Sequence, residues 1–219
     1  FKAPDYVCEK YRQTIVIEAT TVNPTQGEEN TENATEALEG EQLADFMAIK
    51  FGSALFSKLK KYYWELDHVK GHPLVFAIAD FRKPEGVNYS AKFLMEYLYG
   101  LIQEEGGNNS IVYAPIKGHV FKDKKIQSSF FSQPDAENIS AVLFSDGGTI
   151  AKFNRMGKLA EFGDPNLVLV RFGERYENSQ SLEPEWFKAV VEPGSYDETW
   201  AEGIWIFHNP CAKFPLDPA

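Results

Sequence analysis

The feature that most constrains the fold is a continuous apolar run, Leu74–Ala79, which ends at Asp80. An apolar run leaves no polar face, so a strand over it needs to be covered on both sides. Helical periodicity, with apolar residues three and four positions apart, precedes the run over residues 41–66 and follows it over 91–102. The sequence therefore predicts a mixed α/β (α+β) fold in which this run is the central strand.

The chain opens with a predicted pair of strands over residues 3–20, APDYVCEKYRQTIVIEAT. Short runs of β-forming residues at 6–8 and 15–17 flank a polar connection. Asp5 stands before the first run and Glu18 after the second. Carboxylates at the ends of neighbouring strands can converge, and hard divalent cations prefer oxygen ligands. We therefore expect Asp5 and Glu18 to form a site for a divalent cation.

Strands dominate the second half of the predicted order. Further apolar runs predict strands at 111–114, 139–144, 167–172 and 200–207. Asp146-Gly147-Gly148 predicts a hairpin turn, with 149–153 as the returning strand. No linker rich in Pro, Gly and Ser divides the chain. We predict a single domain over 1–219, with a core over 1–110 and a strand-rich extension over 111–219 packed on it.

Composition narrows the class of protein. Two cysteines in 219 residues, Cys8 and Cys211, do not make a disulfide framework, so a reducing, cytoplasmic location is expected. No apolar run reaches the length of a membrane span, so no membrane partner is expected. The net charge of −10 argues against a generic nucleic-acid binder, which carries a basic face. Acidic residues crowd the stretch 27–45, which holds no Lys or Arg.

Basic residues form local clusters at 58–61, 117–125 and 152–158. Charge clusters are usually solvated faces, and contact with phosphate is the alternative for each of these three. Histidine gives no zinc spacing with cysteine or with another histidine, and a structural role is favoured for His208, which closes the last predicted strand. Asp80, at the end of the central run, is a weaker candidate for a third acid, since Arg82 can pair with it.

Pro4-Asp5, followed by Glu18-Ala19-Thr20, a long helix and a buried strand, resembles the core of the PD-(D/E)XK, or restriction-endonuclease-like, nuclease superfamily. The resemblance covers about residues 3–80. It implies a nuclease that hydrolyses phosphodiester bonds, with Asp5 and Glu18 as catalytic metal ligands for Mg²⁺ or Mn²⁺ and the carbonyl of Ala19 as a third ligand. It also implies nucleic acid as the substrate, with DNA expected, in DNA processing or defence. Nucleases of this family often act as dimers, so a homodimer or another protein partner stays open.

Thr20 departs from this family pattern, which has lysine at the third position of the motif. The resemblance allows a lysine on the following helix to take over, and Lys58 and Lys61 are the candidates. They are three positions apart and share a face of the predicted helix. The opposing interpretation is that both are exposed helix lysines. In that case the chain is a catalytically inactive nuclease-like fold that serves as a protein-interaction module.

Overall fold

The computed structural model describes residues 3–22, 38, 40–80, 87–105, 111–175, 185–201 and 203–217. The chain divides into two compact units. The first contains Phe1–Asp146 together with Ile204–Ala219, and the second contains Gly147–Gly203. The predicted division at residue 110 differs from this one, because the last strand of the chain returns to the first unit. The prediction of a single domain stays a prediction.

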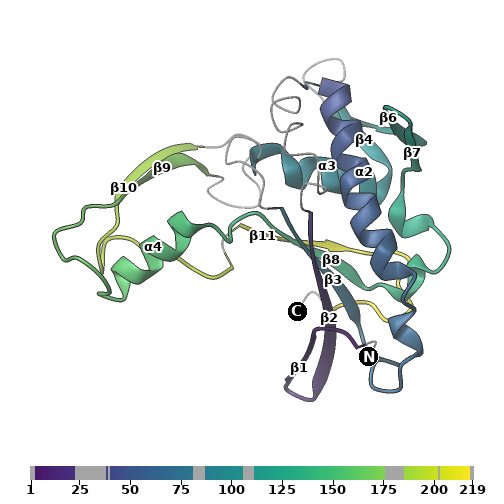
Figure 1. The fold of residues 1–219 in the computed structure, drawn as a ribbon, viewed down its shortest axis with the longest axis horizontal. Coiled ribbons are helices and arrows are strands. Elements are labelled where there is room, and N and C mark those ends of the chain that lie inside the picture. The colour runs from purple at the N-terminus through teal and green to yellow at the C-terminus, as the bar shows by residue number, and fades with distance from the viewer. Residues whose placement is uncertain are drawn as a thin grey trace. The chain divides into compact units, whose positions relative to one another are not determined.

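A five-stranded mixed sheet forms the centre of the first unit, in the order β1-β2-β3-β8-β11 (Figure 1). Its strands are β1 (Tyr6–Lys10), β2 (Gln13–Val22), β3 (Leu74–Asp80), β8 (Ala141–Ser145) and β11 (Ile204–His208). The three central strands β2, β3 and β8 are parallel, and the two outer strands pair antiparallel. The mixed α/β class is confirmed, and the apolar run is the middle strand, with Leu74 and Phe76 fully buried. The restriction-endonuclease-like core itself stays a prediction.

The helix α2 (Gly40–Leu59) follows β2 and packs against both β2 and the helix α3 (Val87–Tyr99). Phe51 of α2 lies edge-on to Phe144 of β8, with ring centroids 5.9 Å apart. The predicted helix 41–66 ends earlier, because Tyr62 adopts a left-handed conformation and the chain turns into the short 3-10 helix η1 (Tyr63–Glu65). Gly100, at φ 68°, similarly ends α3 before residue 102.

Two small hairpins and two 3-10 turns complete the described part of the first unit. The hairpins are β4 (Leu101–Glu105) with β5 (Ile111–Pro115), and β6 (Gly118–Phe121) with β7 (Lys124–Gln127). The 3-10 turns are η4 (Phe130–Ser132) and η5 (Ala136–Asn138). The phenylalanines of η4 enter the core, where Phe130 packs against Phe56 of α2. The segment after residue 115 therefore contributes to the core of the first unit.

The predicted return strand at 149–153 is wrong, because these residues begin the helix α4 (Ile150–Leu159). Thr149 caps this helix, since its hydroxyl accepts a hydrogen bond from the backbone N–H of Lys152 at 3.2 Å. The antiparallel partner of β8 is β11 instead. The second unit also contains the hairpin of β9 (Val170–Arg175) and β10 (Glu185–Val190). No helix in the described ranges is long and apolar enough to cross a membrane.

Candidate functional site

Glu18 is an acid on the buried face of β2. Side chains alternate along a strand, so Val16, Glu18 and Val22 share the face that α2 covers. Glu18 is 2% exposed. A carboxylate taken out of water in this way needs hydrogen-bond and charge partners, because burial of an uncompensated charge is strongly unfavourable. The partners of Glu18 therefore define the site.

Two side chains from the end of α2 and the turn after it contact the same oxygen of Glu18. Lys58 Nζ lies 2.5 Å from Glu18 Oε1, and the Tyr63 hydroxyl donates a hydrogen bond to that oxygen at 2.6 Å. Lys61 Nζ is farther away, at 3.9 Å, and its side chain is 42% exposed. Lys58 reaches Glu18 from the last turn of α2, and the left-handed Tyr62 reverses the chain so that Tyr63 returns to the strand.

Asp5 lies beside this cluster. It immediately precedes Tyr6, which pairs with Ile17, so the antiparallel register places Asp5 across from Glu18. Its carboxylate accepts a hydrogen bond from the backbone N–H of Ala19 at 2.7 Å. The N–H of Ala19 thus ties Asp5 to the residue after Glu18. Asp5 is exposed, whereas Glu18 is buried.

The surroundings of Tyr63 in this cluster raise the pKa of its hydroxyl above the usual value. Burial is the largest cause, followed by the hydrogen bond to Glu18 and the negative charges of Glu18 and Asp5. A phenol that keeps its proton remains a hydrogen-bond donor to Glu18. Tyr63 therefore holds the orientation of the Glu18 carboxylate throughout the ordinary pH range.

The donor set is compatible with a divalent cation of the magnesium type. The second carboxylate oxygen of Glu18, Oε2, is buried and has no hydrogen-bond partner among the described residues. Mg²⁺ is usually held by one or two carboxylates, with waters and substrate phosphates as its other ligands. Asp5 and Glu18 would supply the two carboxylates, and the carbonyl of Ala19 would supply a further oxygen. No group of three or more His, Cys, Asp and Glu side chains in the described ranges is arranged to hold a metal.

Besides Glu18 itself, the sequence predicted four site residues, and the structure places all four at Glu18 or at its neighbour: Asp5, Ala19, Lys58 and Lys61. Thr20 lies two residues beyond Glu18 on the same strand face, and Lys58 supplies the cation that Thr20 lacks.

Asp80 does not join the site at Glu18, because it pairs with Val22, about 13 Å along the strand from the level of Glu18. Its carboxylate accepts a hydrogen bond from Ser90 at 3.0 Å. Arg82 lies outside the described residues.

A second polar chain joins Asp45, His119 and Ser128 at the other end of α2. His119 Nδ1 lies 2.9 Å from Asp45 Oδ1, and His119 Nε2 lies 3.1 Å from Ser128 Oγ. These atoms have the order of a hydrolase triad. Ser128 is 1% exposed and His119 is 4% exposed, so a substrate cannot reach the hydroxyl. These contacts tie the β6–β7 hairpin to α2 and give His119 a structural role.

Tyr63 is the site residue that the sequence did not indicate as functional. Its aromatic neighbours suggest only that the end of the helix docks on the core, and the contact with Glu18 depends on the left-handed turn at Tyr62. The charged residues could be anticipated because their types and order match a known motif. In a comparison with family models, curated proteins and solved structures, none matches this chain.

Proposed function

We propose that this chain is a metal-dependent nuclease that hydrolyses phosphodiester bonds of nucleic acid, with DNA as its substrate. The single observation that carries the proposal is the contact of Lys58 with Glu18, near Asp5, which immediately precedes the neighbouring strand β1. Two carboxylates and a lysine are the charged groups that the resemblance to PD-(D/E)XK nucleases calls for. Here the lysine comes from α2 rather than from the position of Thr20.

Each residue has a role that follows from its position. Asp5, Glu18 and the Ala19 carbonyl would hold Mg²⁺ or Mn²⁺, and the bound ion would polarise the scissile phosphate and acidify the attacking water. Lys58 is placed to neutralise negative charge that develops on the phosphate oxygens. Tyr63 is a positioning residue, because it acts by fixing the Glu18 carboxylate.

The test is a cleavage assay on supercoiled and linear DNA with Mg²⁺ and with Mn²⁺. We expect wild-type cleavage, no cleavage by Glu18→Gln, and a fall in kcat of about 10²–10³-fold in Lys58→Ala. Lys60→Ala is the matched control, because Lys60 is an exposed lysine two residues from Lys58 and makes no contact with Glu18. Wild-type protein that cleaves neither DNA nor RNA with either ion, or Glu18→Gln that cleaves normally, would overturn the proposal.

The alternative function is a protein-interaction module, and one feature of the second unit favours it. The β9–β10 hairpin exposes four large apolar side chains on one face, where Val170 pairs with Val190, Phe172 pairs with the exposed Lys188, and Trp186 follows on the other side of Lys188. Their exposed fractions run from 43% to 68%. Exposed apolar side chains gathered among polar ones commonly mark a contact with another protein. Metal-dependent cleavage that Glu18→Gln abolishes would eliminate the inactive form of this alternative.

A further inference from the structure

The turn that joins β1 and β2 is built from residues that are poorly suited to it. Tyr11 and Arg12 form a two-residue connection and have φ values of 51° and 66°. Positive φ at both positions is the mark of a type I′ hairpin turn, which favours Asn-Gly because bulky side chains are strained in the left-handed region. Tyr and Arg therefore carry a conformational cost that Asn and Gly would avoid.

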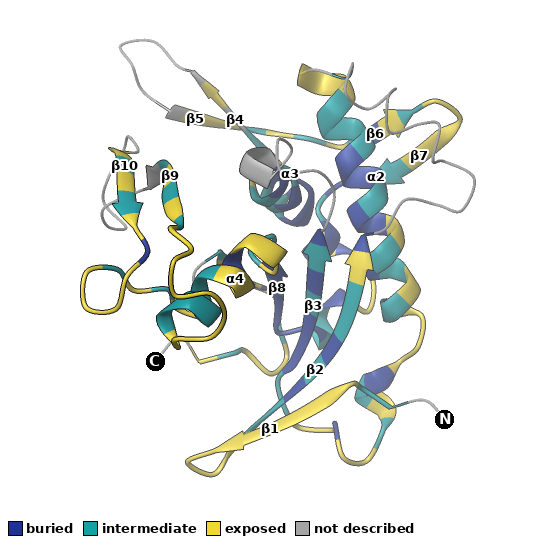
Figure 2. Cartoon of the chain, turned by 60° about the vertical axis from the view of Figure 1, so that its left-hand side comes forward, coloured by how far each residue is buried: buried dark blue, intermediate teal, exposed yellow. Residues whose placement is uncertain are grey.

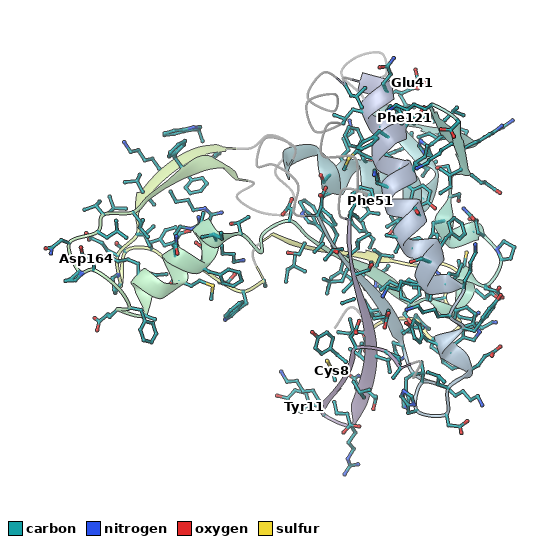
Figure 3. All side chains as sticks on the ribbon, in the orientation of Figure 1. Cys8, Tyr11, Glu41, Phe51, Phe121 and Asp164 are labelled. Carbon is teal, nitrogen blue, oxygen red and sulfur yellow. The ribbon has the colours of Figure 1, made fainter. Side chains whose placement is uncertain are left out.

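Contacts within the described part of the chain do not explain why Tyr11 and Arg12 are there. The Tyr11 side chain is 87% exposed, and Arg12 is exposed as well. The Lys10 ammonium lies over the Tyr11 ring, 5.1 Å from its centroid. Figure 3 shows Tyr11 at the end of the hairpin, and Figure 2 shows β1 exposed along its whole length. Strain that persists with only this local contact between Lys10 and Tyr11 points to a role for what the turn presents outward.

The hairpin tip, defined here as Lys10, Tyr11 and Arg12, presents an aromatic ring between two cations. Cations bind phosphate and base edges, and an exposed ring can stack or contact a base. Glu9 lies in the strand behind the tip, so residues 9–12 keep an excess of one positive charge. The tip therefore has the opposite sign to the chain as a whole, whose net charge is −10.

The dimensions of the hairpin agree with a duplex substrate. The major groove of B-DNA, about 12 Å wide, admits a two-stranded β-ribbon, whereas the major groove of an RNA duplex is too narrow and deep for side chains to read. Lys10 is five residues from Asp5 along an extended strand, which corresponds to about 17 Å. That length equals about five base-pair steps. A tip in the groove would lie a short way along the same duplex as Asp5 and Glu18.

We propose that the hairpin tip inserts into the major groove of double-stranded DNA and fixes the duplex against the Asp5–Glu18 site. The proposal rests on the proposed nuclease function for its choice of substrate. Lys10 and Arg12 contact phosphates or guanine edges, and Tyr11 contacts the bases between them. Because the tip is distant from the reacting phosphate, it acts on binding and on KM, and leaves kcat for bound substrate nearly unchanged.

The test replaces the tip by the residues that the turn prefers, in the double variant Tyr11→Asn/Arg12→Gly. We expect its melting temperature to rise, because the strain is removed, while its affinity for DNA falls about tenfold. Affinity is measured by fluorescence anisotropy of a labelled DNA duplex in EDTA, over a series of salt concentrations. The salt slope should become shallower by about 0.9 for the lost Arg12 contact, and by about 1.8 in Lys10→Gln/Arg12→Gln.

Lys122→Asn is the matched control, because Lys122 has φ 54° in the exposed turn between β6 and β7. This substitution also removes one cation and relieves a left-handed residue. The β6–β7 hairpin is tied to Asp45 of α2, which lies thirteen residues, or about 20 Å of helix, from Lys58. DNA affinity should therefore stay at the wild-type value in this variant.

Three results would overturn the role of the tip. They are wild-type protein that does not bind the DNA duplex, a tip variant that binds with wild-type affinity, and an equal loss of affinity for an RNA duplex of the same sequence. Failure of the nuclease function is distinguishable from failure of the tip. If the protein binds DNA through the tip but does not cleave it in Mg²⁺, the nuclease function is rejected and the role of the tip is kept. If the tip variants cleave DNA with the KM of the wild type, the role of the tip is rejected and the nuclease function is kept.

Discussion

At the scale of single residues, Tyr63 links the buried Glu18 to the response of the fold to alkaline pH. The folded state raises the pKa of Tyr63 above the ordinary value of about 10. The unfolded chain therefore loses this proton first, so the contribution of Tyr63 to stability is complete below about pH 10 and declines as the pH rises beyond it. Tyr63→Phe should lose about 1–3 kcal/mol at neutral pH and show a weaker further decline in alkali.

Urea denaturation at neutral and alkaline pH measures both effects for Tyr63. Tyr11→Phe is the control, because Tyr11 is 87% exposed and makes no hydrogen bond to Glu18. Burial also raises the pKa of Tyr97, so some alkaline decline remains in every variant. An alkaline decline in Tyr63→Phe as steep as that of the wild type would contradict the assignment of the proton to Tyr63.

The charged part of the site was predictable from the sequence, and its aromatic part was not. Asp5, Glu18 and Lys58 have chemical types and an order that a motif can express, and the side-chain period of a strand places Glu18 on the covered face. Tyr63 enters the site because Tyr62 takes a left-handed conformation that the local sequence does not demand. A contact that depends on one backbone angle leaves no periodic signal.

At the scale of elements, Gly52 sets how closely α2 approaches its neighbours. A Cβ at this position would lie 2.0 Å from Ile126 Cδ1 and 2.8 Å from the hydroxyl of the buried Tyr97. Gly52→Ala gains up to about 1 kcal/mol of helix propensity, but overpacking typically costs about 1–3 kcal/mol. We expect a net loss in the free energy of unfolding, measured by chemical denaturation.

Gly157→Ala is the matched control for Gly52→Ala, since Gly157 lies in α4 and a Cβ there would meet nothing within 4 Å. This variant should be stabilised by up to about 1 kcal/mol, because it has the propensity gain without the clash. If Gly52→Ala were stabilised by the same amount, the close packing of α2 against Ile126 and Tyr97 would be disproved.

The elements differ in how far local sequence determines them. Gly52 makes a close contact inside a continuous helix, and the sequence shows only the missing side chain and not the neighbour that fills its place. The Asp146-Gly147-Gly148 stretch has the composition of a hairpin turn, but the Thr149 cap starts α4 and β8 pairs with β11. The partner of β8 is distant in the chain, and such pairings are decided by which edge of the sheet is open.

At the scale of the whole molecule, the order of elements predicted the fold class because each step from β1 to β3 is local. The hairpin, the crossover through α2 and the parallel return to β3 follow directly along the chain. The division into two units was not predictable in this way, since the second unit is inserted between β8 and β11 and no change in composition marks its boundaries. Of the acidic stretch 27–45, residues 27–37 and 39 lie outside the described residues.

Binding of Mg²⁺ should stabilise the whole first unit, because a ligand that binds only the folded chain shifts unfolding by mass action. At ten times the dissociation constant the gain is about 1.4 kcal/mol, which corresponds to about 3–6 °C in melting temperature for a chain of this size. Calorimetry with and without Mg²⁺ measures the shift. Glu18→Gln keeps the shape of the side chain but removes its charge, so its melting temperature should not respond to Mg²⁺.

Weak binding of Mg²⁺ at many acidic surface residues could also raise the melting temperature. A second variant separates this effect from binding at the Asp5–Glu18 site. Glu41→Gln removes one exposed acid from the start of α2, far along the helix from Lys58, and should keep the full response. An equal loss of response in Glu18→Gln and Glu41→Gln would assign the effect to net charge. A wild-type melting temperature that ignores Mg²⁺ would remove the cation from the Asp5–Glu18 site and leave the Lys58–Glu18 pair as a structural contact.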